Sequence, residues 1–166
     1  VAAEVIALCD ADSYRLRPAT FDDAERLFAW RNDEATRAAS HNTEPVAWET
    51  HVAWLQGALR NPDRRLIIAE RSGEAVGVVR VDRSDDIYEL SWTIAGNQRG
   101  RGVGAAIVAM VARGIPEAIR AEVKVGNNAS ARIAIKAGMH FTEERAGVMH
   151  FARDARIASN HYPSCS

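Results

Sequence analysis

The sequence predicts one domain of mixed α and β structure, built on a sheet that is mostly antiparallel. A chain of 166 residues with 47% apolar side chains has the size of one ordinary globular domain and can bury a substantial core. Three strand patterns joined by short polar turns lie near its centre, and a strand–helix–strand order follows. We expect the domain to span residues 14–153, after a lead or linker at 1–13 and before a tail at 154–166.

The first half of this domain is expected to begin with one strand and two helices. Residues 14–18 form the strand, and Thr20 is a suitable N-cap for a helix that runs to about Arg31. The second helix is expected at residues 46–60, before an Asn-Pro stop. Its apolar side chains recur at helical spacing and are predicted to face the core: Trp48, Val52, Leu55 and Leu59.

Strands dominate the middle of the chain, and a glycine-rich loop opens the second half. Two turn-forming segments, residues 72–74 and 82–86, favour hairpins between the predicted strands. The helix after the glycine-rich loop is almost wholly apolar, so it must be buried against a sheet. The remaining elements are strands at residues 66–70, 75–81, 87–94, 121–125, 139–142 and 148–152, and helices at 103–113 and 128–137.

The overall charge and the cysteines exclude several classes of protein. The chain carries 21 basic and 22 acidic residues that are spread along its length, so we expect neither a nucleic-acid nor a membrane partner. Cys9 and Cys165 lack the spacing of a disulfide framework, which favours a reducing cytoplasm. No apolar run approaches the roughly 20 residues of a membrane span, and residues 1–8 lack the basic flank of a signal peptide. We therefore expect a cytoplasmic protein without a membrane anchor.

The glycine-rich loop is suited to an anion. It lies between a strand and a buried helix, where backbone N–H groups lack partners and the helix dipole is positive. Glycines at alternate positions let the backbone close around phosphate oxygens, and Arg99 and Arg101 add positive charge. A pyrophosphate fits this description.

Two common phosphate-binding loops match this segment poorly. A P-loop needs a Lys-Ser or Lys-Thr pair after its glycines, and none follows them here. Gly100, Gly102 and Ala105 do satisfy the G-x-G-x-x-A spacing of a dinucleotide-binding loop. The strand before them, however, alternates polar and apolar residues instead of forming the apolar run of a central parallel strand. A plain glycine-rich turn before a buried helix remains an alternative.

Two segments resemble motifs of the GNAT acetyltransferase family. R-G-R-G-V-G at residues 99–104 is similar to the acyl-CoA loop of that family: Arg or Gln, two residues, Gly, one residue, then Gly or Ala. N-N-A-S at residues 127–130, followed by K-A-G-M at 136–139, is similar to the family's N-x-x-S segment and the K-x-G-F end of its last helix. The resemblance covers roughly residues 14–152 and implies the GNAT acyl-CoA N-acyltransferase fold, an α/β (α+β) fold whose mixed, mostly antiparallel sheet has splayed central strands and flanking helices.

The resemblance implies acetyl-CoA as the co-substrate. In GNAT enzymes the strand before the loop and the strand after its helix splay apart, and the pantetheine arm of coenzyme A enters the gap. Those strands here are residues 87–94 and 121–125. Loop amides would hold the pyrophosphate, and the acyl carbonyl would lie in the gap. The implied cofactor-binding residues are Thr93, Ile94, Arg99, Gly100, Arg101, Gly102, Val103, Gly104, Ala105 and Asn127.

Transfer to an amine requires a proton acceptor, because a protonated amine has no lone pair to offer. Glu89 shares a strand face with Ser91 and Thr93 and resembles the family's frequent glutamate on that strand, although it could be an ordinary solvent-facing residue. The tyrosine that commonly protonates the coenzyme A thiolate in this family would stand at Ala134. We therefore expect Ser130 or water in that role, with helix capping as the alternative for Ser130.

The acceptor is indicated by W-R-N at residues 30–32 and H-x-x-W-L at 51–55. These segments resemble the GNAT branch of the amino-sugar acetyltransferases of pseudaminic acid biosynthesis and, more loosely, of the ribosomal-protein N-terminal acetyltransferases. The resemblance implies a primary amine acceptor, such as a nucleotide-linked amino sugar. The expected substrate-binding residues are Trp30, Asn32, His41 and Trp54, although both tryptophans could instead belong to the core.

Other functions stay open at this point. The acceptor could be a ribosomal protein, a peptide or a small amine, and the domain could bind acyl-CoA as a sensor without turnover. The five histidines lack metal-ligand spacing, so no metal is expected, and the absence of a G-x-S-x-G elbow excludes a serine hydrolase. Assembly as a homodimer is left open.

Overall fold

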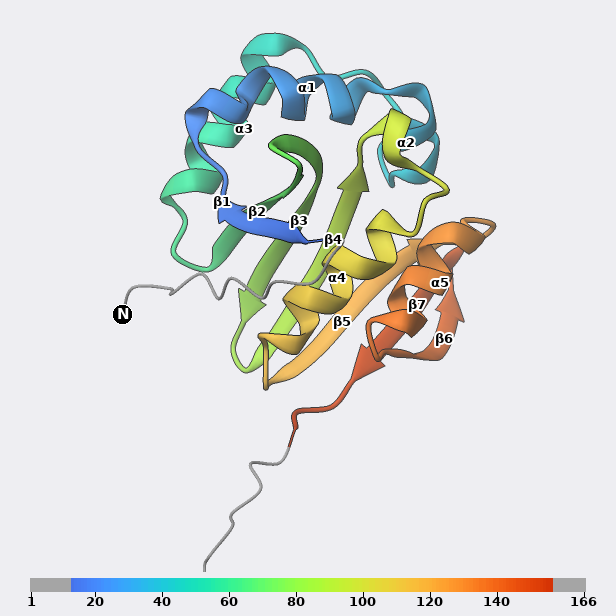
Figure 1. The fold of residues 1–166 in the computed structure, drawn as a ribbon. Coiled ribbons are helices and arrows are strands. Elements are labelled where there is room, and N and C mark those ends of the chain that lie inside the picture. Colours follow the sequence, from blue (N-terminus) through green and yellow to red (C-terminus); the bar gives the residue numbers. More distant parts are fainter. Residues whose placement is uncertain (1–12, 157–166) are drawn as a thin grey trace, which may run out of the picture.

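The structure is a computed structural model that describes residues 13–156. Most of the expected lead at 1–13 and tail at 154–166 lies outside the described residues, and so do Cys9 and Cys165. Ser13 and residues 154–156 are the parts of the lead and tail that are described. Seven strands form one sheet in the order β1-β2-β3-β4-β5-β7-β6 (Figure 1). The strands are β1 (Tyr14–Pro18), β2 (Arg64–Arg71), β3 (Glu74–Ser84), β4 (Ile87–Ile94), β5 (Ala118–Lys124), β6 (His140–Arg145) and β7 (Val148–Arg153).

Helices cover both faces of this sheet. Alternate residues of β2 belong to different cores: Leu66 and Ile68 pack with α1 and α3, whereas Ala69 lies in the larger core with α4. Because successive strand residues point to opposite faces, α1 and α3 lie on one face and α4 and α5 on the other (Figure 1). The helices are α1 (Ala24–Asn32), α2 (Glu34–Ala39), α3 (Trp48–Arg60), α4 (Val103–Arg113) and α5 (Asn128–Lys136), with 3₁₀ turns η1 (Phe21–Asp23) and η2 (Gly96–Gln98).

The sheet is open in its middle. β4 pairs with β3 along its whole length, from Ile87 to Ile94. Among the described strands, its pairing with β5 is the one parallel pairing, and it extends only from Ile87–Ala118 to Glu89–Arg120. The two strands then separate, which leaves backbone groups of both facing a gap. This confirms the predicted fold, with a mixed and mostly antiparallel sheet and splayed central strands.

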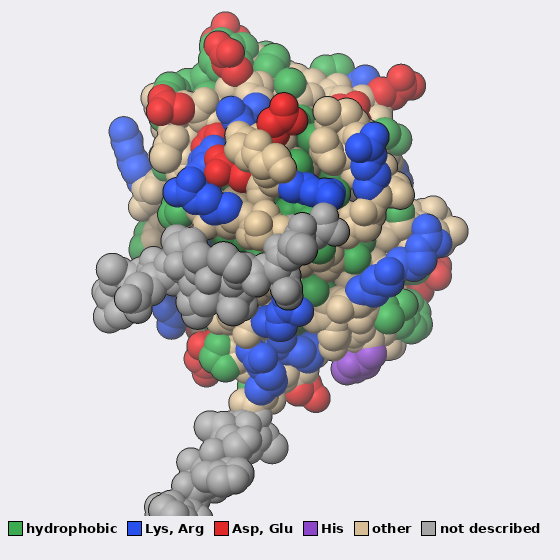
Figure 2. All heavy atoms as spheres, in the orientation of Figure 1, with side chains coloured by type: hydrophobic (Ala, Val, Ile, Leu, Met, Phe, Trp, Pro, Cys, Tyr) green, Lys and Arg blue, Asp and Glu red, His purple; other side chains and the backbone are tan. Residues whose placement is uncertain are grey.

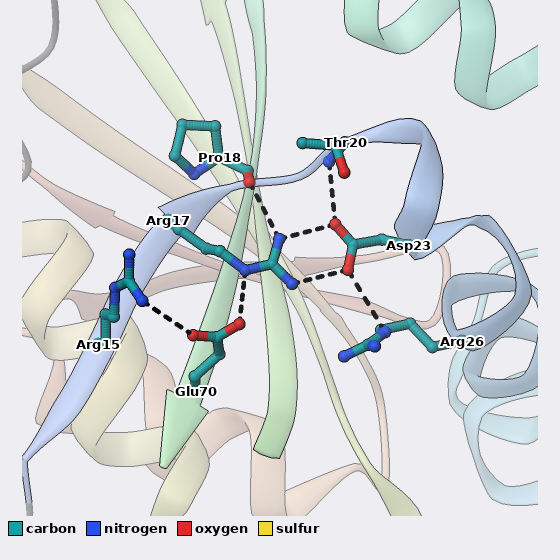
Figure 3. A network of polar contacts seen from close by, with 7 residues as sticks. All are labelled: Arg15, Arg17, Pro18, Thr20, Asp23, Arg26 and Glu70. Atoms are coloured by element: carbon teal, nitrogen blue, oxygen red, sulfur yellow. Dashed lines mark hydrogen bonds and ion pairs between the residues drawn. The ribbon is translucent and has the colours of Figure 1, made fainter. Parts of the chain in front are cut away.

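An ion network around the buried Asp23 fixes the start of α1 to the sheet (Figure 3). Arg17 Nη1 and Nη2 each donate to one carboxylate oxygen of Asp23 at 2.8 Å, and Arg17 Nε donates to Glu70 Oε1 at 2.6 Å. Asp23, only 2% exposed, also accepts from the Thr20 backbone N–H at 2.9 Å. The hydrogen bond from Arg17 is the main cause of a pKa of Asp23 below its usual range. The network joins β1 and β2 to the first helix.

Two helical details differ from prediction. Thr20 is the N-cap of the short turn η1, and α1 itself starts four residues later, at Ala24. Helix α2 was not expected, because none of its residues is buried and it therefore has no apolar stripe to reveal it. Its N-terminus is fixed by Asp33, whose side chain accepts from Thr36 N at 3.0 Å.

The predicted core stripe of α3 is wrong in part. Leu55 is fully buried, but Trp48 and Leu59 are 38% and 39% exposed. The helix instead buries His51, Leu55 and Ala58. His51 Nε2 lies 2.8 Å from the backbone oxygen of Ala24, an acceptor, so this nitrogen donates. Burial lowers the pKa of His51, so its ring is a neutral part of the core.

Candidate active site

The glycine-rich loop leaves open space and free amides at the start of α4. Gly100 and Gly102 have φ angles of 72° and 77°, a left-handed conformation that favours glycine. No atom lies within 4 Å of a Cβ added at either position. The first helical hydrogen bond runs from Ala106 N to Gly102 O, so the amides of residues 103–105 have no helical partner. A pyrophosphate fits this positive helix end.

Gly104 has a different role from Gly100 and Gly102. A Cβ at this position would lie 2.5 Å from Ile133 Cδ1 and 3.3 Å from Ile94 Cγ1. Gly104 therefore lets α4 approach α5 and β4 closely, and the reason for glycine here is helix packing rather than access of a ligand. A larger residue would disturb the packing of α4 before it reached a phosphate.

The two arginines of the loop do not lie as the sequence suggested. Arg99 Nη2 donates to Asp33 Oδ2 at 2.7 Å and to Thr36 Oγ1 at 2.8 Å, which ties the loop to the start of α2. This bond is the main reason why the pKa of Asp33 is lowered. The guanidinium of Arg99 is thus committed to α2, and Arg101 is exposed outside the cavity lining.

A cavity of about 950 Å³ runs from this loop across the opened strands to α1 and α3. It brings together nearly all of the predicted site. The predicted residues that line it are Trp30, His41, Trp54, Glu89, Thr93, Ile94, Arg99, Gly100, Gly102, Val103, Gly104, Ala105, Asn127 and Ser130. Asn32 and Arg101 are the two predicted residues that do not.

Asn32 has a structural role instead. Its Nδ2 donates to Val46 O at 2.9 Å, and its Oδ1 accepts from Val46 N at 2.8 Å. Both ends of the amide are used to hold the chain before α3 against the end of α1, so we leave Asn32 out of the proposed substrate contacts. Trp30 packs against the core under α1 and α3, and Trp54 is 39% exposed at the cavity.

The start of α5 forms one wall of the cavity. Asn127 is its N-cap, and its side-chain oxygen accepts from Ser130 N at 3.1 Å. This bond engages the backbone of Ser130 and leaves its hydroxyl at the cavity. Ala134, one turn further, is fully buried, so no side chain at the position of the family's tyrosine reaches the cavity.

Glu89 lies on β4 where the strands begin to separate. Its neighbours in register are Asp82 on β3 and Arg120 on β5. Leu90 points into the core under α4, so Glu89 points to the other face, toward α1 and α3. It is exposed and lines the cavity. This is the face on which the sequence pattern placed it.

Sequence reasoning missed a second carboxylate, Glu122 of β5. It also lines the cavity, and it lies between two histidines from distant parts of the chain. His41 Nε2 is 3.6 Å from Glu122 Oε2, and His150 Nδ1 is 3.6 Å from Glu122 Oε1. The only local signal was the alternation along β5, which puts Glu122 opposite the core residues Ala121 and Val123.

The cavity carries far more basic than acidic side chains. Among residues 13–156, Glu89 and Glu122 are the two that line it with a carboxylate. Figure 2 shows Lys and Arg side chains gathered over α5, the helix that carries two of the basic lining residues. Such a site can hold a polyanion at one end and a cationic group beside its carboxylates. The basic residues that line it are Arg31, Arg80, Arg99, Lys124, Arg132 and Lys136.

Two negative findings concern the described residues. Within 13–156, no group of three His, Cys, Asp or Glu side chains is placed to hold a metal ion. In the same part of the chain, none of the helices has the length and apolar character needed to cross a membrane.

Comparison with solved structures finds the same fold in several proteins. A domain from Methanocaldococcus jannaschii DSM 2661 is 22% identical, with 85% of this chain and 97% of that chain covered and a TM-score of 0.76. An aminoglycoside acetyltransferase in complex with coenzyme A is 17% identical over 86% and 95% of the two chains, with a TM-score of 0.74. A ribosomal-protein-alanine N-acetyltransferase from Brucella melitensis is 24% identical, with 84% of this chain and 98% of that chain covered and a TM-score of 0.70. Comparison with curated proteins gave no significant match.

A family model settles the relationship that these folds suggest. The model of the acetyltransferase (GNAT) domain matches residues 14–140, which is most of the chain. The protein therefore belongs to the GNAT acetyltransferase family, and it is an acyl-CoA N-acyltransferase whose co-substrate is acetyl-CoA.

Proposed function

We propose that this enzyme acetylates the primary amine of an amino sugar, carried on a nucleotide, by direct attack on acetyl-CoA. The observation that carries the proposal is the single cavity, which joins the open glycine loop to Glu89 and to the aromatic side chains of α1 and α3. A co-substrate at one end and an acceptor at the other can therefore meet where β4 and β5 separate.

Three features support acetyl-CoA at the loop end. The free amides of residues 103–105 and the open space beside Gly100 and Gly102 suit the pyrophosphate. The basic side chains Lys124, Arg132 and Lys136 line the same cavity and suit the remaining negative charge of the coenzyme. Unpaired backbone groups of β4 near Thr93 and Ile94 suit the amides of the pantetheine arm.

Glu89 is the proposed proton acceptor. An amine enters mostly as the ammonium ion, whose N–H bond must break before nitrogen can attack. Glu89 takes this proton, directly or through a water. The freed lone pair forms the bond to the acetyl carbon, and the C–S bond then breaks so that sulfur leaves as thiolate. The nitrogen gives up its second proton, which reaches the thiolate through Ser130 or water, so that the products are a neutral amide and the thiol of coenzyme A. Ser130 is the proposed proton donor to that thiolate, which is a tolerable leaving group even without one.

The aromatic and polar residues that line the acceptor end of the cavity favour a sugar as the acceptor. Trp54 presents about two fifths of its surface, and Trp30 and His41 lie in the same wall. Aromatic side chains with a polar edge suit the mixed apolar and hydroxyl surface of a sugar. Arg31, which donates to Asn42 O, and Arg80, which is paired with Asp82, also line the cavity, and their remaining N–H groups suit the phosphates of a nucleotide carrier. The W-R-N and H-x-x-W-L segments that suggested this class supply Trp30, Arg31 and Trp54.

The test is release of coenzyme A thiol from acetyl-CoA with a panel of amines. The panel contains a nucleotide-linked 4-amino-4,6-dideoxy sugar, a polyamine, free amino acids and a peptide with a free N-terminus. We expect kcat/KM for the amino sugar to exceed the others by on the order of 10³-fold. A peptide or polyamine as the best acceptor would overturn the sugar proposal, and coenzyme A binding without amine-dependent release would indicate a sensor.

Glu89→Gln tests the chemistry separately. We expect kcat to fall by about 10²–10⁴-fold at neutral pH and to recover partly at high pH, where more of the amine is already neutral. Glu143→Gln is the matched control, because Glu143 is an exposed carboxylate on β6 that does not line the cavity. An unchanged pH–rate profile in Glu89→Gln would assign Glu89 to the structure of the strand.

A further inference from the structure

Glu122 lies where the gap between β4 and β5 begins. The last parallel pair joins Glu89 to Arg120, and Glu122 is the next residue of β5 on the same face as Arg120. Its side chain is 42% exposed and lines the cavity on the side of α1 and α3. Glu122 is therefore beside the place that the proposed function gives to the acetyl group, across the gap from the strand that carries Glu89.

Two histidines from different elements lie beside the Glu122 carboxylate, each 3.6 Å from one of its oxygens. His41 follows α2 and approaches one oxygen, whereas His150 lies opposite Glu122 in the β5–β7 register and approaches the other. The side chain of His150 is only 20% exposed, so it forms a fixed wall, while that of His41 is 62% exposed. A carboxylate oxygen has two acceptor positions, so each oxygen can still accept from a further donor.

We infer that Glu122 is an acceptor-binding residue, which receives the ammonium group of the amine beside the acetyl group. The inference rests on the proposed function for the position of the acetyl group. Glu122 binds and orients the cation, and Glu89 remains the residue that takes its proton. His41 and His150 are positioning residues for the Glu122 carboxylate. The cation recognised is an alkyl ammonium ion, because both neighbouring strands present a carboxylate to it.

The charge balance of the cavity supports this assignment. The other charged residues of the lining are basic, apart from Glu89, and an incoming ammonium ion is repelled by them. Two of these basic residues are already paired, Arg99 with Asp33 and Arg80 with Asp82, and Lys124 Nζ donates to Ala38 O at 3.1 Å. Without Glu122, Glu89 would be the one carboxylate near the acetyl group to attract the ammonium ion. A second carboxylate at the gap therefore makes this position more favourable for the cation.

Steady-state kinetics of Glu122→Gln with the best amine of the panel give the first test. We expect KM for the amine to rise by on the order of 10- to 100-fold, because a charge-assisted hydrogen bond is lost, while KM for acetyl-CoA and kcat at saturating amine change little. Glu122→Asp should recover part of the affinity. Glu144→Gln should behave as wild type, because Glu144 is an exposed carboxylate of β6 outside the cavity lining. An unchanged KM for the amine, or a loss confined to kcat, would overturn the inference.

Binding without turnover gives the second test. The probe is glucosamine, titrated into the protein saturated with coenzyme A, and the readout is the ring C–H NMR signals of His41 and His150. His41→Gln and His150→Gln assign these signals. We expect glucosamine to shift both signals in wild type and neither in Glu122→Gln, with circular dichroism showing that the variant is folded.

The two tests separate this inference from the proposed function. Histidine shifts that depend on Glu122, in a protein that acetylates no amine, would support the binding residue and contradict the enzymatic proposal. Rapid acetylation of glucosamine itself with no shift of either histidine would leave the enzyme intact and overturn the role of Glu122. Neither shift nor acetylation would overturn both.

Discussion

Replacement of Arg17 by Ala should be among the most destabilising single changes in this protein. Arg17 makes both side-chain hydrogen bonds across the Asp23 carboxylate and a third to Glu70 (Figure 3). Without it, the Asp23 carboxylate, which is 2% exposed in the wild-type structure, keeps as partners only the Thr20 backbone N–H and Arg26 at 3.3 Å. Removal of one member of a buried ion pair costs roughly 3 kcal/mol or more. For a chain of this length, that loss lowers Tm by about 6–12 °C.

The assay is urea unfolding followed by circular dichroism, with Arg15→Ala as the matched control. Arg15 is on the same strand and approaches the other oxygen of the same Glu70, but at 3.9 Å and with 76% of its side chain exposed. An exposed pair of this kind contributes at most about 1 kcal/mol, so the control should unfold almost as wild type. Equal midpoints for the two variants would refute the argument that burial makes the Arg17 network important.

Acid titration of the same variants gives an independent readout. The pKa of Asp23 is lowered in the folded protein, so its contribution to stability is complete above the unfolded value of about 3.9 and is lost as pH falls through the folded value. The difference in unfolding free energy between wild type and Arg17→Ala should therefore be constant from about pH 7 to 5 and narrow below about pH 4. A difference that widened on acidification would contradict the assigned cause.

Two further changes test the packing of the helices. Gly104→Ala should lower the free energy of unfolding in urea by about 1 kcal/mol, because the added Cβ meets Ile133 Cδ1. Ile133→Val deletes that atom and should restore most of the lost stability in the double variant. Additive effects of the two changes would show that the two residues do not meet. His51→Gln should remove a pH-dependent loss of stability. Burial lowers the pKa of His51, so the unfolding free energy of wild type decreases as pH falls below about 6.5. In the variant, the dependence of unfolding free energy on pH should lack this part. An identical pH dependence in the two proteins would assign the loss of stability to other groups.

Periodicity in the sequence was informative where one face of an element is buried. β4 and α4 begin and end at the predicted residues, because the apolar residues of each repeat with the period of its own structure. Helix α2 has no buried residue, so its sequence contains no such repeat. In α3 the apolar repeat was read correctly as helical and Leu55 is buried as predicted, but the buried face also includes His51 and Ala58 in place of Trp48 and Leu59. The acceptor that allows His51 to be buried, the backbone oxygen of Ala24, is distant in the sequence.

The same distinction applies to the site. The loop and the N-cap of α5 are contiguous motifs, so the sequence located them, and the cavity does bring them together with Glu89. The tie between Arg99 and Asp33 and the position of Glu122 between His41 and His150 join residues from distant elements. Pairing of this kind depends on strand order and on how α2 lies over the sheet, which no local pattern specifies.

The contact between β4 and β5 is the shortest strand pairing of the described sheet, and the core around α4 joins the two halves on either side of it. Three residue pairs join these strands, against eight between β3 and β4, and each half of the sheet is one unbroken length of chain. Acetyl-CoA, in the gap where we place it, would contact both β4 and β5 and so stabilise the association of the two halves of the sheet. A ligand at a hundred times its dissociation constant adds about 2.7 kcal/mol to stability by mass action. The supply of the co-substrate would thus set both the rate of the enzyme and its resistance to heat and proteolysis.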